Sequence, residues 1–210
     1  MIKYIDFNYI PYKPSEKSVL LRLGYNKKVI ATESEMHDIN KAIEKASTFC
    51  FPKARCLYLG ILSRTESSIT LENGTELKSE KLARLLLNSD KALLMAATLG
   101  DEVTQKISYE LSDGDKVFSV ILDAYASQCV DGTLGYIMKF ESQKLFRHGN
   151  RITRRRFSPG YGGLDIGYQR ELFSTLNLED LDMEITDSFL LIPEKSVIAI
   201  AGVEKITFNI

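Results

Sequence analysis

The sequence predicts an α+β fold whose sheet is largely antiparallel towards the carboxyl end. Helical and strand patterns follow one another throughout the chain, without a repeat, a low-complexity segment or a long linker. Near the carboxyl end, strand patterns follow one another without intervening helices. This order argues against a doubly wound nucleotide-binding fold, in which strands and helices alternate.

Composition and charge narrow the class of protein. The chain has 210 residues, of which 44% are hydrophobic and 26% charged, so it can bury a core, and we expect residues 1–210 to form a single domain. Its 27 basic and 28 acidic side chains give a formal net charge of −1. No general electrostatic field therefore favours nucleic acid or an anionic membrane.

Membrane and secretion signals are missing from the sequence. No apolar run approaches the roughly 18 to 20 residues that cross a bilayer, and the amino terminus, Met1–Asp6, lacks the apolar core of a secretion signal. We therefore expect a cytoplasmic protein. The three cysteines, Cys50, Cys56 and Cys129, are odd in number and show no C-x-x-C pattern, which predicts free, mostly buried thiols.

The amino-terminal half of the chain mixes helices and strands. The patterns predict a helix over 15–22, a helix capped by Ser34, a strand over 55–61, a hairpin over 69–77 and a helix that Ser79 caps. Asn73 and Gly74 suit a tight primed turn in the hairpin.

The carboxyl-terminal half adds one long helix and most of the remaining strands. The patterns predict a buried strand over 92–98, helices over 101–112, 115–147 and 168–176, and strands over 183–186, 189–192, 197–201 and 206–208. Gly202 and its two successors are expected to turn the last two strands back on each other.

A run of arginines that leads into a glycine-rich loop is the most informative segment. Arg151, Arg154, Arg155 and Arg156 precede Ser158–Gly163, in which three glycines and a proline surround a tyrosine. Guanidinium charge beside freely exposed backbone can hold a carboxylate or a phosphate. On residue types alone, a tight structural turn is an equal alternative. The loop matches neither a Walker loop nor a dinucleotide-binding fingerprint.

Small and acidic residues line one face of the long predicted helix. Asp123, Ser127 and Asp131 are spaced i, i+4 and i+8, and Gly135 extends the line. Such a face could leave room for a ligand, and a plain solvent-exposed face is the simpler alternative. Within a helix, Gly132 and Gly135 each lower the stability by about 1 kcal/mol relative to alanine. The usual reason for a glycine at such a position is the close approach of a ligand or another backbone.

The histidines of the chain do not favour a metal site or histidine-based catalysis. His37 and His148 are the two histidines of the chain, and neither has a second histidine or a cysteine at ligand spacing. No serine stands in a Gly-x-Ser-x-Gly pattern. We therefore expect neither a metal site nor a hydrolytic triad.

The arginine-rich loop resembles a signature of a known family. Arg156-Phe157-Ser158-Pro159-Gly160-Tyr161 matches Arg-x-x-x-Gly-Tyr, the S-adenosylmethionine-binding signature of the activation domain of cobalamin-dependent methionine synthase. The segments 186–189 and 192–197 are similar to a later Thr-Glu-Ser-Phe, Pro and Ser-Val sequence of that family at similar spacing. Residues 19–25, 95–100 and 122–124 resemble its small stand-alone members. The resemblance implies an α+β fold with helices flanking a twisted antiparallel sheet.

The resemblance also implies a function. Domains of this family present S-adenosylmethionine to the cobalamin of methionine synthase when that cofactor has reached its inactive cob(II)alamin form. An electron from flavodoxin or a similar donor then allows reductive methylation, in support of methionine biosynthesis. The expectation is a stand-alone reactivation partner for a methionine synthase or another corrinoid protein, with no catalytic residues of its own.

Residue roles follow from the same resemblance. Arg156 would pair with the methionine carboxylate, Ser158 and Gly160 would belong to the ligand-binding loop, and Tyr161 would face the cobalamin. Asp131 falls where the family carries an acidic residue in its long helix, and Asp6 matches the amino-terminal aspartate that binds the ligand.

The chain departs from the family after Tyr161. The family continues with Pro-Ala-Cys-Pro-Asp-His, whereas residues 162–167 here read Gly-Gly-Leu-Asp-Ile-Gly, and a late tyrosine that helps to hold the adenosyl ligand has no counterpart. This departure motivates an alternative function, a non-catalytic module that docks on a corrinoid protein without S-adenosylmethionine. A nucleic-acid-binding domain built on Arg151–Arg156 is disfavoured because aromatic and basic residues do not interleave.

Overall fold

A computed structural model describes residues 3–26, 28–29 and 32–206. Within these residues, seven strands form one antiparallel sheet: β1 (Ile5–Phe7), β2 (Lys53–Arg64), β3 (Ser68–Leu71), β4 (Glu76–Lys78), β5 (Ser89–Thr98), β6 (Asn150–Ile152) and β9 (Ser196–Lys205). The strand order is β4-β3-β2-β5-β9-β6, and β1 pairs with β2. A separate hairpin joins β7 (Glu184–Ile185) and β8 (Leu191–Ile192).

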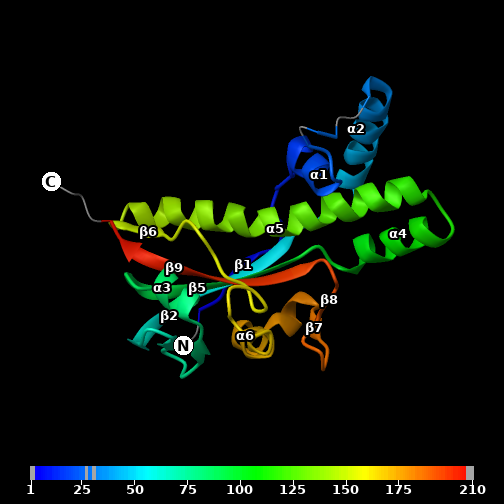
Figure 1. Cartoon of the computed structure of the whole chain (residues 1–210). Helices are drawn as coiled ribbons and strands as arrows, with labels where there is room; N and C mark the ends of the chain where they lie inside the picture. The colour runs from blue at the N-terminus through cyan, green and yellow to red at the C-terminus, as the bar shows by residue number, and fades with distance from the viewer. Residues whose placement is uncertain (1–2, 27, 30–31, 207–210) are drawn as a thin grey trace.

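Helices cover both faces of the sheet (Figure 1). They are α1 (Glu16–Arg22), α2 (Glu33–Ser47), α3 (Glu80–Leu85), α4 (Asp101–Ser112), α5 (Lys116–Phe146), α6 (Tyr168–Leu176) and the 3-10 helix η1 (Leu178–Leu181). The long helix α5 lies across one face, where α1, α2 and α4 pack against it, whereas α3 and α6 lie on the other face. The predicted α+β fold, with helices that flank a largely antiparallel sheet, is confirmed.

Both faces of the central strands are buried. In β5, Leu93, Met95 and Ala97 belong to the core under α5, and the alternating residues Ala92, Leu94 and Ala96 belong to the core on the α6 side. Alternation between two apolar layers explains why residues 92–98 read as a continuous apolar run.

Helix α5 is the central helix of the layer that it forms with α1, α2 and α4 on one face of the sheet. Asp115 caps it by accepting a hydrogen bond of 3.0 Å from the Phe118 amide, and its 31 residues extend over about 46 Å. The sheet buries one side of α5, and the other helices of this layer bury much of its amino-terminal half. None of the helices in the described ranges has the length and apolar character needed to cross a membrane.

The cap of α2 differs from the prediction. Thr32, not Ser34, is the N-cap: its Oγ1 accepts a hydrogen bond of 3.3 Å from the Glu35 amide, and Glu35 Oε2 accepts one of 2.7 Å from the Thr32 amide. This reciprocal arrangement requires a glutamate three residues after the cap, a spacing that Thr32 provides. Ser34 therefore lies inside the first turn.

The β3–β4 hairpin is confirmed, but its turn is not the predicted primed one. The Gly74 amide donates to the Leu71 carbonyl and the Leu71 amide donates to the Thr75 carbonyl, both at 2.9 Å. Both kinds of primed turn need positive φ at the first central residue, and type I′ needs it at the second as well. Of Asn73 and Gly74, only the second, Gly74, has positive φ, at 89°.

The predicted turn at Gly202 is wrong. Strand β9 continues through this residue to Lys205, and Gly202 pairs with Ala92 in β5. A Cβ atom here would lie 2.1 Å from Ser89 Oγ, so the glycine permits close packing instead of a change of direction. The predicted strand over 206–208 begins after β9, and residues 207 and 208 lie outside the described residues.

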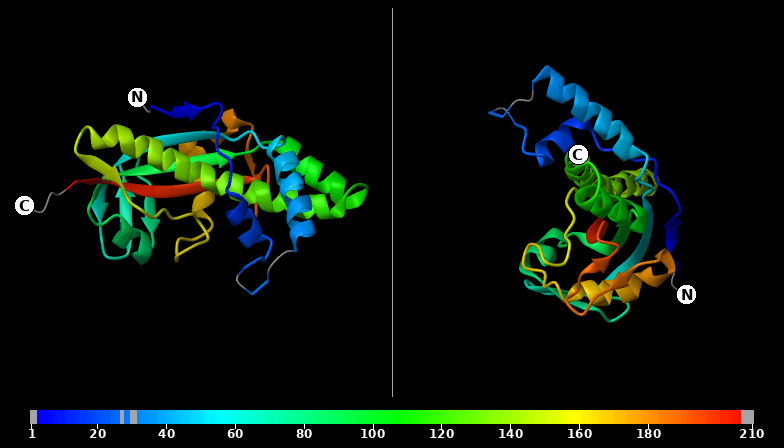
Figure 2. Two further views of the ribbon diagram at one scale, coloured as in Figure 1. Left: turned by 90° about the horizontal axis from the view of Figure 1, so that it is seen from above. Right: turned by 90° about the vertical axis from the view of Figure 1, so that its right-hand side faces the viewer.

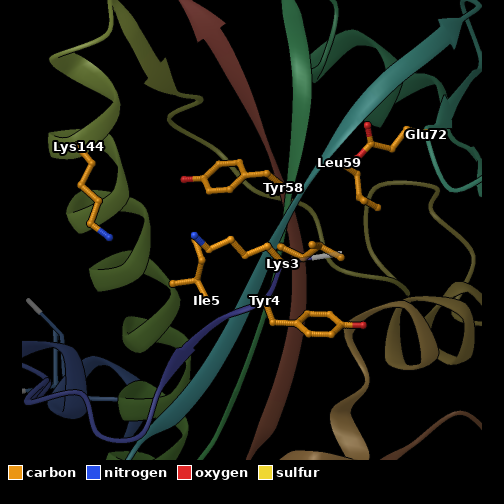
Figure 3. A pocket seen from close by; sticks show the side chains of 8 residues that line it. Lys3, Tyr4, Ile5, Tyr58, Leu59, Glu72 and Lys144 are labelled. Atoms are coloured by element: carbon orange, nitrogen blue, oxygen red, sulfur yellow. The ribbon is translucent and has the colours of Figure 1, made fainter. Parts of the chain in front are cut away.

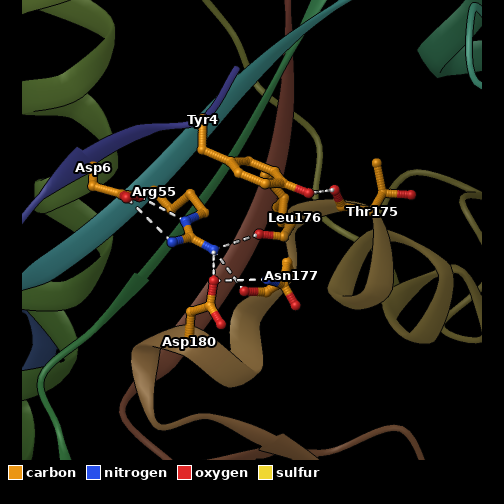
Figure 4. Close-up of polar contacts among 7 residues, drawn as sticks. All are labelled: Tyr4, Asp6, Arg55, Thr175, Leu176, Asn177 and Asp180. Carbon is orange, nitrogen blue, oxygen red and sulfur yellow. Dashed lines mark hydrogen bonds and ion pairs between the residues drawn. The ribbon is translucent and has the colours of Figure 1, made fainter. Parts of the chain in front are cut away.

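Arg55 on β2 ties distant parts of the chain together (Figure 4). Its Nε and Nη2 donate to the two carboxylate oxygens of Asp6 at 2.6 and 3.1 Å, and its Nη1 donates to Asp180 and to the Leu176 and Asn177 carbonyls at the end of α6. Only 5% of Arg55 is exposed. The nearby carboxylate of Asp6 raises the pKa of Arg55, so the guanidinium stays charged. This cluster fastens the side chain of Asp6 on β1 and the end of α6 to β2.

We expect Arg55→Met to lower the free energy of unfolding by about 3 kcal/mol, because it leaves two carboxylates and two carbonyls without their cation. Urea denaturation measures the change. Lys53→Met on the same strand is the matched control, since its 3.9 Å pair with Asp182 is exposed and exposed pairs contribute less than about 1 kcal/mol. Equal effects of the two substitutions would contradict the role of Arg55.

Candidate functional site

The segment that carries Arg156 runs along the outer edge of β9. The Thr153 amide donates to the Gly202 carbonyl at 2.9 Å. Phe157 and Ile200 then exchange two main-chain hydrogen bonds, of 2.9 and 2.7 Å. These bonds place Arg156 between the edge of the sheet and α5.

Arg156 and Asp131 form an ion pair, although 25 positions separate them in sequence. Arg156 Nη2 donates to Asp131 Oδ1 at 2.7 Å and to the Asp131 main-chain carbonyl at 3.0 Å. Within the described residues, Nε and Nη1 of Arg156 have no hydrogen-bond partner. The side chains are 24% and 66% exposed, respectively. Asp131 thus holds the guanidinium by one nitrogen, and the other two donate to no group in the described part of the chain.

The loop after Arg156 is braced by its own main chain. The amides of Gly160, Tyr161 and Leu164 donate to the carbonyls of Leu164, Ser158 and Tyr161 at 2.8, 3.1 and 3.0 Å, respectively. Leu164 is buried below the loop, whereas Tyr161 is 73% exposed at its tip. The segment is therefore a tight structural turn that also presents a tyrosine to solvent. A ligand role for Ser158, Gly160 and Tyr161 stays a prediction.

The glycine that follows Tyr161 has a specific packing reason. Gly162 has φ of 60°, and a Cβ atom at this position would lie 1.9 Å from the ring of Phe157. Its carbonyl accepts a hydrogen bond of 3.2 Å from Ser79 Oγ, at the start of α3. The glycine-rich sequence after Tyr161 therefore folds the loop back onto the protein.

The polar stripe of α5, formed by Asp123, Ser127 and Asp131, faces two segments from the carboxyl-terminal part of the chain. Asp123 accepts a hydrogen bond of 2.6 Å from the buried Lys195, which immediately precedes β9. Asp131 holds Arg156 about 12 Å further along the helix, and the half-buried Ser127 lies between the two ion pairs. Both aspartates of the stripe are thus engaged with cations from the carboxyl-terminal part of the chain.

Gly132 makes room for Tyr12, a residue that the sequence analysis missed. A Cβ atom on Gly132 would lie 2.1 to 2.3 Å from ring atoms and the hydroxyl oxygen of Tyr12. The close approach expected at this glycine is therefore made by an aromatic side chain. At Gly135, by contrast, a Cβ atom would meet nothing within 4 Å. A glycine inside a helix beside Asp131 was the available signal for Tyr12, but it does not say which residue approaches.

Tyr12 stands in the electrostatic field of the ion pair. Burial raises the pKa of its phenol, as do the neighbouring Cys129 and Asp131, while Arg156 acts in the opposite direction. The phenol therefore stays neutral at physiological pH, and its hydroxyl can both donate and accept a hydrogen bond.

Asp6 is not part of this arrangement. It lies on β1, on the far side of β2, and β5 and β9 separate that edge from the Arg156 segment. Both of its carboxylate oxygens accept hydrogen bonds from Arg55. The structure thus brings Asp131, Arg156 and the loop of Ser158, Gly160 and Tyr161 to one edge and leaves Asp6 at the other.

A cavity of about 700 Å³ lies beside β1 and β2 (Figure 3). In the sheet, β5 and β9 separate these strands from the Arg156 segment. The cavity is lined by Lys3, Tyr4, Ile5, Leu57, Tyr58, Leu59, Glu72 and Lys144. Lys144 and Tyr58 both donate to the buried Glu141, at 2.7 and 2.9 Å. None of the predicted site residues lines it. Among the described residues, no group of three or more histidine, cysteine, aspartate or glutamate side chains could hold a metal ion.

Comparison with known proteins identifies the fold. No protein-family model matches the chain, and no curated protein matches its sequence. A solved structure does match, the crystal structure of the MetH reactivation domain bound to AdoHcy, with a TM-score of 0.66 over 100% of this chain and 80% of that chain. The two sequences are 14% identical, so the likeness shows the fold: this chain has the fold of a MetH reactivation domain.

Substitution of the two glycines of α5 should have opposite effects. We expect Gly132→Ala to destabilise the protein by about 1 kcal/mol, because the new methyl group displaces the Tyr12 ring. Gly135→Ala should stabilise it by about 1 kcal/mol, since its methyl group enters open space and alanine favours the helix. Urea denaturation of the two variants distinguishes these outcomes, and equal stability of both would contradict the packing of Tyr12 on Gly132.

Proposed function

We propose that this chain is a stand-alone reactivation partner of a cobalamin-dependent methionine synthase or a related corrinoid protein. In this role residues 1–210 act as one domain that binds S-adenosylmethionine and presents it to the cobalamin of the partner. The observation that carries the proposal is the likeness, over the whole chain, to a reactivation domain bound to AdoHcy. AdoHcy is S-adenosylhomocysteine, the product that S-adenosylmethionine leaves after donating its methyl group.

The proposed chemistry needs little from the protein beyond orientation. One electron from a flavodoxin-like donor reduces cob(II)alamin to cob(I)alamin on the partner. The cobalt then takes the methyl group with its own electron pair, and the electrons of the broken carbon–sulfur bond stay on sulfur, giving S-adenosylhomocysteine. No proton moves, so a site without a general acid or base is sufficient. The product is methylcobalamin, which serves methionine biosynthesis.

The residues at the edge of β9 fit this role. Arg156 offers Nε and Nη1 to the methionine carboxylate while Asp131 fixes its orientation. Ser158 and Gly160 shape the loop that approaches the ligand, and the exposed Tyr161 faces the cobalamin. Asp6 lies at the other edge of the sheet, where both of its carboxylate oxygens accept from Arg55.

Isothermal titration with S-adenosylmethionine tests the proposal. The wild-type protein should bind, and Arg156→Ala should bind about 10- to 100-fold more weakly, because hydrogen bonds to a charged group contribute about 1.5 to 3 kcal/mol. Arg154→Ala is the matched control, since this neighbouring arginine is exposed, and its affinity should equal that of the wild type. Equal heats from wild type and Arg156→Ala would remove Arg156 from the site, and no heat from the wild type would refute ligand binding.

A second candidate function is a module that docks on a corrinoid protein without binding S-adenosylmethionine. The engagement of Asp6 by Arg55 favours it, because that aspartate matches the ligand-binding aspartate of the family. The two functions differ in a reconstituted assay with a cobalamin-loaded partner and a reductant. The reactivation partner accelerates methylation of the cobalamin by S-adenosylmethionine, whereas the docking module binds the partner without this effect.

A further inference from the structure

Tyr12 is held rigidly over α5. The chain between β1 and α1 crosses α5 on its way to the helical layer (Figure 2). The buried Ile10 anchors this crossing by donating its amide to the Pro52 carbonyl at 2.9 Å. Cys129 Sγ on α5 donates to the Tyr12 carbonyl at 3.6 Å, and the Tyr12 ring rests on Gly132. Contacts at its main chain and at its ring therefore fix the position of the hydroxyl.

The hydroxyl of Tyr12 lies near the Arg156–Asp131 ion pair, close enough for both charges to act on it. A Cβ atom on Gly132 would come within 2.3 Å of this oxygen, and the residue before Gly132 is Asp131. Asp131 Oδ1 accepts from Arg156, and within the described ranges Oδ2 accepts no hydrogen bond. Within the described residues, the site thus combines two guanidinium nitrogens that have no hydrogen-bond partner with two nearby oxygen acceptors, Asp131 Oδ2 and Tyr12 Oη.

This arrangement favours one class of ligand end. An α-amino acid carries a carboxylate and an ammonium group on the same carbon, so its two charges lie side by side. The carboxylate fits the free nitrogens of Arg156, and the ammonium then meets the acceptors on α5 and on the crossing segment. A simple carboxylate or phosphate would satisfy the arginine alone and would face the negative charge of Asp131.

We propose that Tyr12 is a specificity-determining residue of the Arg156 site, whose hydroxyl oxygen accepts a hydrogen bond from the α-ammonium group of the bound ligand. The inference rests on the proposed function, since it takes the ligand to be S-adenosylmethionine or its product. It assigns the recognition of the ammonium group to Tyr12 and Asp131, on the same edge of the sheet as Arg156. Asp6, the residue expected from the family to bind the ligand, lies at the opposite edge.

The test compares two ligands that differ only in the α-amino group. They are S-adenosylhomocysteine and its analogue without that group, titrated calorimetrically into wild type, Tyr12→Phe and Tyr9→Phe. Tyr12→Phe keeps the ring on Gly132 and should bind S-adenosylhomocysteine about tenfold more weakly, in the range of a hydrogen bond to a charged group. It should bind the analogue as the wild type does. Tyr9→Phe, an exposed tyrosine of the same crossing segment, should match the wild type with both ligands.

The outcomes separate this inference from the function on which it rests. If the wild type binds S-adenosylhomocysteine and Tyr12→Phe binds it equally well, the role of Tyr12 is overturned and the proposed function stands. If Tyr12→Phe weakens both ligands to the same extent, the hydroxyl supports the fold of the site, and the assignment to the ammonium group is wrong. If the wild type binds neither S-adenosylhomocysteine nor S-adenosylmethionine, both proposals fall.

Discussion

The packing of α5 across β5 and β9 is the constraint on which the rest of the structure depends. The helix can lie there because alternate residues of these strands are apolar on its side, among them Met95 and Ala199. Its position sets Asp131 and Gly132 opposite the outer edge of β9. The Phe157–Ile200 bridge brings the Arg156 segment to the same edge, and the crossing segment brings Tyr12. The Tyr12 segment, the Asp131 region and the Arg156 segment thus meet at the helix α5 and the strand β9. Regular elements of this kind position side chains more accurately than loops alone.

The ion pairs Arg55–Asp6 and Arg156–Asp131 differ in two respects. One is the burial of the arginine, and the other is the number of its guanidinium nitrogens that donate to protein oxygens. Arg55 is almost fully buried, and all three of its guanidinium nitrogens donate to protein oxygens. Nothing is left for a ligand, so this pair is structural. Arg156 is partly exposed and, within the described residues, uses a single nitrogen. Its partner Asp131 is well solvated, so the pair contributes little stability, and in the described residues two guanidinium nitrogens of Arg156 have no hydrogen-bond partner.

The sequence predicted most elements because their signals are local. The apolar run of β5, the acids and caps at the starts of α4 and α5, and the glycine-containing hairpin each follow from neighbouring residues. The three-residue strands β1 and β6 were missed, since they are too short for an alternating pattern and form by pairing with β2 and β9. Gly202 was misread as a turn because the reason for it, the nearby Ser89, is more than a hundred residues away in sequence.

The same distinction between local and long-range signals applies to the site. Arg156 and Asp131 could each be picked from sequence, one by its loop and the other by its place on a helix face, but their contact depends on the fold. Two other contacts could not be predicted without the fold, because each joins the amino-terminal segment to a later element. They are the packing of Tyr12 on Gly132 and the ion pair between Asp6 and Arg55. A motif comparison places Asp6 in the ligand site, but it does not show where Asp6 lies in the fold. Because β1 pairs with β2, Asp6 lies with Arg55 at one edge of the sheet, and the acceptors near Arg156 at the other edge come from α5 and from the segment that crosses it.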